Sequence, residues 1–275
     1  MITLAIDTAG REGSVALAEA GHGRWAVLGL APLAGGTYSA QLIPAIAALL
    51  ASAGVAKEAV DLLAVNSGPG SFTGLRVGLS TVKGLAESLH QPIVAISGLE
   101  ALAIAARLAP PTKNSSGRSG RCIAAMDAQR QEVYVGEYEI SAIAKAESAV
   151  DIRQGKLDSH RRESETVDDD IPRAECIGER LISLAAFVAE LASASAGQAG
   201  ARTICTADAG IERALQAAGV AVEAVARPRA DLIARIGTVR YRQGSAISPE
   251  ALDANYIRRS DAEIFSTPAS GAAPE

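Results

Sequence analysis

The sequence predicts an α/β protein made of two related halves, and three observations point to this class. The chain has 275 residues, of which 48% are hydrophobic, so it suits two modest domains better than one. Short apolar segments of strand length alternate with segments of helical periodicity through the first half. The segment from Ala5 to Leu17 also has a partial counterpart from Ala125 to Val135. In each, an apolar strand ends at an aspartate, an acidic residue follows five positions later, and an apolar strand returns.

The first half predicts strands in hairpins, followed by alternating helices and strands. Strands are expected at Ile2–Ile6, Ser14–Ala18, Trp25–Leu30 and Pro92–Ile96. A helix that starts at Ser39 and stops at Gly54 would bury a stripe at helical spacing, formed by Leu42, Ile43, Ile46, Leu49 and Leu50. Ser97 and Glu100 predict a capping box for a further helix, which ends before Pro110.

The best organised stretch runs from Leu62 to Gly78. An apolar strand ends at Gly68-Pro69-Gly70, and a helix follows with Gly74 and Gly78 on one face. A glycine-rich turn before a helix can cradle a phosphate, or it can let a second helix approach closely. The spacing matches neither GxGxxG, because Thr73 stands at the third glycine position, nor a Walker A loop, because leucine rather than lysine follows Gly74. The pattern therefore favours packing over phosphate binding.

The second half is expected to repeat the unit around a long charged insertion. Its helices and strands alternate in the order Leu181–Ala192, Thr203–Cys205, Ile211–Ala218, Val220–Val225 and Arg229–Gln243, beginning and ending with a helix. We therefore divide the chain into a first domain (1–110), an exposed loop (111–120), a second domain (121–259) with an insertion at about 141–173, and a flexible tail (260–275).

Composition limits the partners and the compartment. The net charge of -5 and pI of about 5.4 argue against free binding to nucleic acid, although not against joining a complex that holds it. The three cysteines are widely spaced and the three histidines form no metal-binding pair, which indicates reduced thiols and no metal. The apolar segment Leu42–Ala56 is shorter than the roughly 20 residues that a membrane span needs. We expect a soluble, cytoplasmic protein with no membrane contact.

Two aspartates are the candidates for chemistry. Asp7 and Asp127 each end a strand, where a carboxylate can hold a metal or a nucleotide-bound water, or can accept hydrogen bonds from the amides of its own turn. The turn is the simpler account of both residues. No nucleophile–base pair and no metal motif accompanies them in the sequence, so a peptidase has little support. The residues favour a scaffold over an enzyme.

Three motifs together resemble the TsaB (YeaZ) family. They are Ala5-Ile6-Asp7-Thr8-Ala9, the highly specific run from Gly68 to Gly78 (GPGSFTGLRVG), and the run from Met126 to Tyr134 (MDAQRQEVY). The match extends from Ile2 to about Tyr138 and returns weakly at Asn255–Arg258. This family is the bacterial dimerisation subunit of the machinery that makes N6-threonylcarbamoyladenosine (t6A) at position 37 of tRNA.

The resemblance implies an actin-like (ASKHA) fold with two tandem RNase H-like domains, in agreement with the internal repeat. The related catalytic subunit, TsaD, binds a metal through paired histidines on a helix, and this chain has no such pair. The resemblance thus implies a non-catalytic subunit without a cofactor of its own, which pairs with a TsaD-type threonylcarbamoyltransferase. A TsaE-type ATPase would dock on that pair, and tRNA would be reached only through the complex. The resemblance also leaves open that the chain forms a homodimer when it is alone. Asp7 and Thr8 would form a degenerate nucleotide loop, and weak nucleotide binding there is not excluded by the resemblance.

The family builds its partner interface from its first two helices. Carried over to this chain, the interface comprises Tyr38, Gln41, Leu42, Ala45 and Leu49 from the first helix, and Phe72, Gly74, Leu75, Val77, Gly78 and Thr81 from the second. A helix of the partner is expected to come close at Gly74 and Gly78. Tyr38-Ser39-Ala40 stand where the family commonly has His-Ser-Gln, so contacts that depend on that imidazole or amide are not expected here.

One alternative function stays open beside this resemblance. The chain could be an ATP-binding enzyme of the same fold, a small kinase or ATPase, in which Asp7 and Asp127 flank a metal-bound nucleotide. Tight binding of ATP and magnesium that is lost in Asp7→Ala would favour this alternative.

Overall fold

The computed structural model describes residues 1–21, 23–110, 120–141, 171–195 and 202–257. They form two five-stranded sheets with the same topology, in the orders β3-β2-β1-β4-β5 and β8-β7-β6-β9-β10. In each sheet three antiparallel strands are followed by two parallel ones. This equivalence confirms the predicted repeat and the α/β fold class.

The bounds of the elements follow the chain. The first sheet contains β1 (Ile2–Asp7), β2 (Glu12–Gly21), β3 (Arg24–Ala34), β4 (Leu62–Gly68) and β5 (Ile93–Ser97). The second sheet contains β6 (Gly120–Asp127), β7 (Glu132–Ile140), β8 (Ala174–Ser183), β9 (Thr203–Thr206) and β10 (Glu223–Ala224). The α-helices are α1 (Tyr38–Ala53), α2 (Phe72–Leu89), α3 (Gly98–Leu108), α4 (Leu184–Ser195), α5 (Ala209–Ala217) and α6 (Ala230–Arg242).

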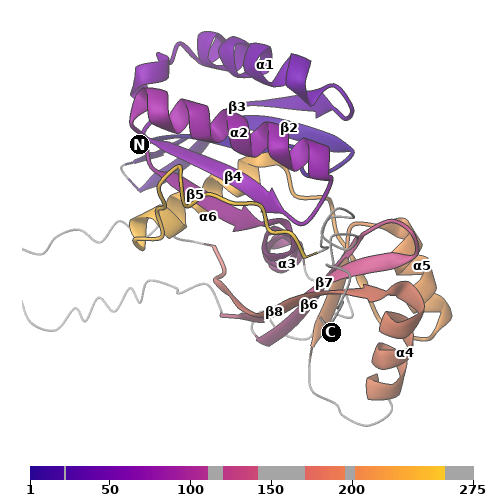
Figure 1. Ribbon diagram of the computed structural model, residues 1–275. Coiled ribbons are helices and arrows are strands. Elements are labelled where there is room, and N and C mark those ends of the chain that lie inside the picture. Colours follow the sequence, from indigo (N-terminus) through magenta and orange to yellow (C-terminus); the bar gives the residue numbers. More distant parts are fainter. Residues whose placement is uncertain (22, 111–119, 142–170, 196–201, 258–275) are drawn as a thin grey trace, which may run out of the picture.

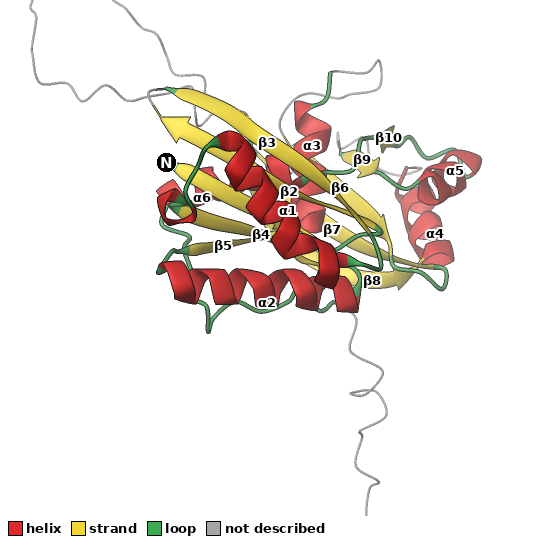
Figure 2. Cartoon of the chain, turned by 90° about the horizontal axis from the view of Figure 1, so that it is seen from above, coloured by secondary structure: helices red, strands yellow, loops and turns green. Residues whose placement is uncertain are grey.

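Helices and sheets alternate in layers (Figure 1). Helices α1 and α2 cover the outer face of the first sheet, α3 and α6 lie between the two sheets, and α4 and α5 cover the far face of the second. Successive side chains of β1 alternate between the two faces, so Leu4 and Ile6 pack beneath α1 and α2 while Ala5 packs towards α6. Figure 2 shows α1 and α2 from above, lying side by side over the sheet.

Helix α6 comes late in the chain but packs on the first sheet. Buried hydroxyls of Thr3 and Thr238 lie 2.8 Å apart, and the backbone N–H of Ala230 donates to the Ser14 hydroxyl at 2.9 Å. Gly237 sits so close to β4 that a Cβ there would lie 2.6 Å from the Cβ of Ala64. The lobes of the structure therefore differ from the predicted division at 110 and 121, because the chain returns from the second lobe to complete the core of the first.

Several predicted elements form where the sequence placed them, while two elements and the burial of one residue differ. Helix α1 ends at Gly54 in the left-handed conformation, and Ser97 caps α3 by accepting a hydrogen bond from the N–H of Leu99 at 3.2 Å. The helix predicted from Leu181 is wrong at its start, because residues 174–183 form the edge strand β8. Ile43 was predicted to be buried, but it is 54% exposed. The strand predicted at 220–225 is limited to β10.

The remaining predicted segments fall mainly outside the described residues. They are the loop at 111–120, most of the insertion at 141–173, and the tail at 260–275. Among the helices that are described, none combines the length and the apolar character needed to cross a bilayer.

Candidate functional site

The glycine-rich loop after β4 is pressed against the hairpin between β1 and β2. The backbone N–H of Ser71 donates to the carbonyl oxygen of Ala9 at 2.7 Å, and a Cβ at Gly70 would lie 2.2 Å from that same oxygen. The hydroxyl of Ser71 caps α2 by accepting a hydrogen bond from the N–H of Gly74 at 3.3 Å. The loop is therefore a tight backbone junction, as its composition predicts.

Gly74 and Gly78 face the interior of the same chain. A Cβ at Gly74 would lie 2.1 Å from the carbonyl oxygen of Thr8, and a Cβ at Gly78 would lie 2.3 Å from the Thr8 hydroxyl. This corrects the expectation that these two glycines are open to a partner's helix. Close approach is indeed what they allow, but the approaching group is the strand β1 and its hairpin.

Asp7 and Thr8 are used within the first lobe. The Asp7 carboxylate accepts hydrogen bonds from the Ala9 N–H at 3.0 Å and from the Asn66 side chain at 3.1 Å, and burial raises its pKa despite both bonds. The Thr8 hydroxyl donates to the Gly74 carbonyl at 2.7 Å. Neither residue lines the cleft described next. Asp7 therefore behaves as a turn-stabilising residue, the simpler of its two interpretations.

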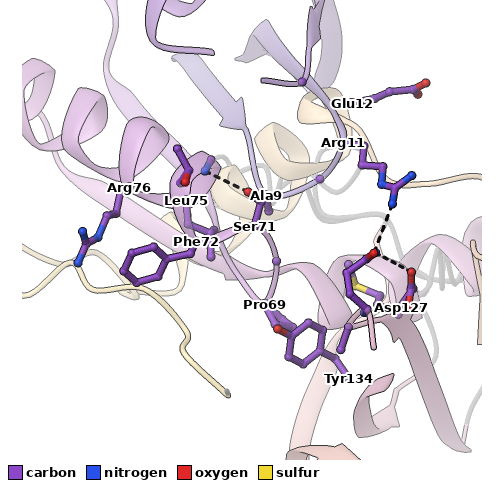
Figure 3. A pocket seen from close by; sticks show the side chains of 18 of the residues that line it. Ala9, Arg11, Glu12, Pro69, Ser71, Phe72, Leu75, Arg76, Asp127 and Tyr134 are labelled. Atoms are coloured by element: carbon purple, nitrogen blue, oxygen red, sulfur yellow. Dashed lines mark hydrogen bonds between the residues drawn. The ribbon is translucent and has the colours of Figure 1, made fainter. Parts of the chain in front are cut away.

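A cleft of about 1480 Å³ opens between the two lobes. Its walls come from the β1–β2 hairpin, the start of α2, the β6–β7 turn and the C-terminal segment. Figure 3 shows the Arg11 side chain reaching across it to the turn at Asp127. Arg11 donates to the side-chain oxygen of Gln129 at 3.3 Å, and the Gln129 side-chain nitrogen donates to Asp127 at 2.7 Å. The two hairpins predicted from the repeat thus meet at this cleft.

Two charged side chains of the cleft, Asp208 and Arg227, form an ion pair. Asp208 accepts from Arg227 at 2.7 Å and from the backbone N–H of Asp127 at 2.9 Å. Within the described ranges, no group of three or more His, Cys, Asp or Glu side chains is arranged to hold a metal ion. The arrangement offers a polar recess for a ligand or for a segment of a partner, and the described side chains display no nucleophile–base pair within it.

The predicted interface residues divide into three groups. Those that are buried in the first lobe are Tyr38, Leu42, Leu49, Gly74, Leu75 and Gly78. Those that are half-buried are Gln41, Ala45, Val77 and Thr81, and Phe72 is 43% exposed. The buried group is the side of α1 and α2 that packs on the first sheet, so only the other residues can reach a partner without rearrangement. Their contact with a partner stays a prediction.

The outer side of α1 is apolar and uncharged. No Asp, Glu, Lys, Arg or His occurs from Trp25 to Ala56, which spans most of β3 and all of α1. Ile43 on α1 is 54% exposed, and Val27 and Leu28 on the adjacent β3 are 45% and 37% exposed. We call the exposed parts of α1 and of β3 from Trp25 onward the neutral surface. The sequence already indicates this surface, because the uncharged stretch is longer than α1. The helical spacing of apolar residues nevertheless predicted that Ile43 would be buried.

Comparisons with known proteins agree with this architecture. A family model described as TsaD, tRNA N6-adenosine threonylcarbamoyltransferase, matches residues 31–264. A protein of Haemophilus influenzae described as tRNA threonylcarbamoyladenosine biosynthesis protein TsaB is 37% identical over 134 residues, which is 49% of this chain and 52% of that protein. A tRNA N6-adenosine threonylcarbamoyltransferase of Novosphingobium aromaticivorans is 40% identical over 80 residues, or 29% of this chain and 23% of that protein.

A solved structure extends the similarity of fold to nearly the whole molecule. YeaZ from Pseudomonas aeruginosa superposes with a TM-score of 0.61 at 24% sequence identity, covering 93% of this chain and 99% of that chain. The sequence match is shorter, since the chain spans about half the length of the curated TsaB relatives that it matches.

Proposed function

Since the chain belongs to the family of the TsaD model, and within it to the TsaB (YeaZ) group, we propose that it is the non-catalytic subunit of a machinery that makes t6A at position 37 of tRNA. In this proposal the chain pairs with a TsaD-type threonylcarbamoyltransferase, and a TsaE-type ATPase docks on the pair. It acts in the cytoplasm and meets tRNA only through the complex. In the absence of the TsaD-type subunit, the free chain forms a homodimer through the surface that would otherwise bind that subunit.

The neutral surface is the observation that carries this proposal. Helix α1 exposes Ile43 and several alanines and carries no charge, and a contiguous exposed apolar surface of this kind is typical of a protein–protein contact. Helix α2 lies beside it and exposes Phe72 near its start. The uncharged exposed side of α1, with Phe72 beside it at the start of α2, suits packing against helices of a partner of the same fold.

The non-catalytic role is supported by how the first lobe uses its polar groups. Asp7 and Thr8 are the residues that a nucleotide site of this fold would place in the cleft, but here they bond Ala9, Asn66 and Gly74. We propose that the chain has no cofactor of its own and that any nucleotide binding in the cleft is weak.

Reconstitution tests the function directly. Unmodified tRNA is incubated with the TsaD-type subunit, the TsaE-type ATPase and an extract of cells that lack this chain, with or without the purified chain, and t6A is measured by mass spectrometry of the nucleosides. The proposal requires that t6A form in quantity only when the chain is present. Equal t6A in both reactions would contradict it.

Calorimetry separates the proposal from the alternative of an ATP-using enzyme. The structure places Asp127 on the cleft and Asp7 off it, so both cannot flank one nucleotide without rearrangement. We expect weak or no heat on titrating ATP and magnesium into the chain. Tight binding that Asp127→Ala abolishes would favour the enzyme.

A further inference from the structure

A carboxylate at the junction of the two lobes accepts three hydrogen bonds, from β5, from β7 and from the segment after α6. Glu179 on β8 accepts from the Ser97 hydroxyl at 2.6 Å, from the Tyr138 hydroxyl by a short bond, and from the Asn255 side-chain amide at 2.5 Å. Burial and the adjoining Glu179 carboxylate both raise the pKa of Tyr138, so the phenol keeps its proton and donates it. Hydrogen bonds to an ionised acceptor are about twice as strong as neutral ones, which makes this a firm anchor.

The third donor belongs to the C-terminal segment Leu252–Ile257, which we call the strap. Leu252 is buried in the core beneath α1 and α2. Asn255 is held at its backbone as well as at its side chain, because its N–H donates to the carbonyl oxygen of Ser67 at 2.7 Å. The strap thus crosses the end of β4 with its middle residue fixed to both lobes.

The residue after this anchor completes an exposed aromatic patch. The Tyr256 ring lies 5.5 Å from the Phe72 ring, centroid to centroid, and the Arg76 guanidinium lies 3.9 Å from the Phe72 centroid. Tyr256 and Phe72 are 42% and 43% exposed, although the chain has only nine aromatic residues in all. Figure 3 shows Phe72 and Arg76 together at the start of α2, away from the cluster at Asp127.

We propose that Glu179 is a positioning residue that holds the strap against α2, so that Phe72, Arg76 and Tyr256 form one partner-binding patch. This inference rests on the proposed function, because the patch continues the surface of α2 that would meet the partner. No carboxylate of the described residues pairs with Arg76. The chemistry of the patch therefore fits a partner segment that carries an acidic residue beside an apolar side chain.

Hydrogen exchange on the free protein tests the anchor without any partner. In Glu179→Gln we expect amide exchange in residues 252–257 to rise by about tenfold, because the neutral amide is a weaker acceptor, with exchange in α1 unchanged. Glu175→Gln is the matched control, since Glu175 lies on the same strand and is exposed. Unchanged exchange in the strap of Glu179→Gln would overturn the inference.

A double-mutant cycle on partner affinity tests whether Glu179 acts through Tyr256. With the TsaD-type subunit as the probe, Glu179→Gln and Tyr256→Ala should each weaken binding about tenfold, and the double variant should be no weaker than Tyr256→Ala within about twofold. Arg76→Glu should weaken binding more than Arg76→Gln. Losses that multiply in the double variant, or a loosened strap with unchanged affinity, would overturn the inference.

The two experiments distinguish this inference from the proposed function. If wild type fails to bind the TsaD-type subunit, the proposed function fails and the partner role of the patch is overturned with it, whatever the exchange shows. If wild type binds and Glu179→Gln binds equally well, only the inference is overturned.

Discussion

At Gly74 and Gly78 the absence of a Cβ allows α2 to pack closely against Thr8 in the first lobe. Their spacing was enough to predict close packing on one face of α2. What the spacing could not predict was the identity of the neighbour, because Thr8 lies far away in the sequence and meets the helix only after the sheet has formed. The structure assigns both glycines to the junction between α2 and β1.

Substitution of two glycines of α2 should therefore have opposite effects. Gly78→Ala should lower the free energy of unfolding by about 1–3 kcal/mol, because its Cβ would meet the Thr8 hydroxyl at 2.3 Å. Gly84→Ala on the same helix should raise the free energy of unfolding by about 0.5–1 kcal/mol, since nothing lies within 4 Å of its Cβ. Urea denaturation of the three proteins checks both, and equal stabilities would refute the packing assigned to Gly78.

The turn between β6 and β7 carries three successive non-glycine residues in the left-handed region. Gln129, Arg130 and Gln131 have φ angles of 64°, 52° and 62°. This conformation disfavours residues with a Cβ, and the turn is held by bonds such as that from the Leu184 N–H to the Gln131 carbonyl at 2.8 Å. The MDAQRQEVY motif predicted a turn here but not its handedness.

Gln131→Gly should relieve part of this strain. The free energy of unfolding should rise by about 0.5–1 kcal/mol, because glycine adopts a φ of 62° without the Cβ clash. Gln131→Ala is the control, since it removes the same polar atoms but keeps the Cβ, and should show no such gain. Thermal unfolding of the two variants measures the difference; an equal gain in both would point to the side chain rather than the backbone.

At the scale of elements, α3 and α6 form the layer shared by the two lobes. Glu100 on α3 is buried beside Arg240 on α6, with their charged atoms 2.8 Å apart. Burial raises the pKa of Glu100 to about 7, Arg240 acts against the rise, and Glu179 adds to it. The capping box predicted the place of Glu100 in the helix, but its partner on α6 follows from the return of the chain to the first sheet.

The free energy of unfolding should therefore decrease as the pH rises, because the Glu100 carboxyl loses its proton. The pKa is 4.5 in the unfolded chain and about 7 in the folded one, so the proton is held more tightly in the folded state, and its contribution is complete below pH 4.5 and lost as pH rises through 7. Relative to Glu100→Gln, the wild-type free energy of unfolding should decline by roughly 1–3 kcal/mol between pH 4.5 and 8. Chemical denaturation of both proteins across this range measures it, and parallel pH profiles would exclude the shift.

The strand β8 and the exposure of Ile43 were missed for two separate physical reasons. The strand β8 has most of its residues exposed, so it lacks the apolar run that signals a strand, and it is stabilised by its ladder with β7. Ile43 belongs to the apolar stripe of α1 by spacing, but α1 is apolar around most of its circumference. A stripe on such a helix does not tell which side is buried.

At the scale of the whole molecule, the duplicated topology could be predicted from the sequence. The packing of α6, which comes late in the chain, on the first sheet could not. Two strand–Asp–strand motifs sufficed to predict two similar sheets. The placement of α6 on the first sheet required the tertiary structure, because an amphipathic helix does not encode which sheet it covers. The cleft also depends on this tertiary packing, because the two predicted hairpins line it only once the lobes are joined.

The first 110 residues should consequently not fold alone. Without α6, the face of the first sheet that carries Ala5, Ala16 and Ala64 would lie open to water. We expect a fragment of residues 1–110 to show poor amide dispersion in NMR spectra, whereas a fragment of residues 1–257, which keeps α6 and the strap, should match the full chain. A well-dispersed spectrum from the short fragment would show that the first lobe is autonomous.

The central claim, that the neutral surface binds a TsaD-type subunit, is tested most directly by one substitution on it. Ile43→Glu places a charge at the most exposed large apolar side chain of α1, and Ile177→Glu is the matched control at 51% exposure on β8 of the other lobe. Size-exclusion chromatography with light scattering gives the mass of each protein mixed with the TsaD-type subunit. We predict a complex for wild type and Ile177→Glu and separate subunits for Ile43→Glu. A complex of equal mass and stability with Ile43→Glu would contradict the account.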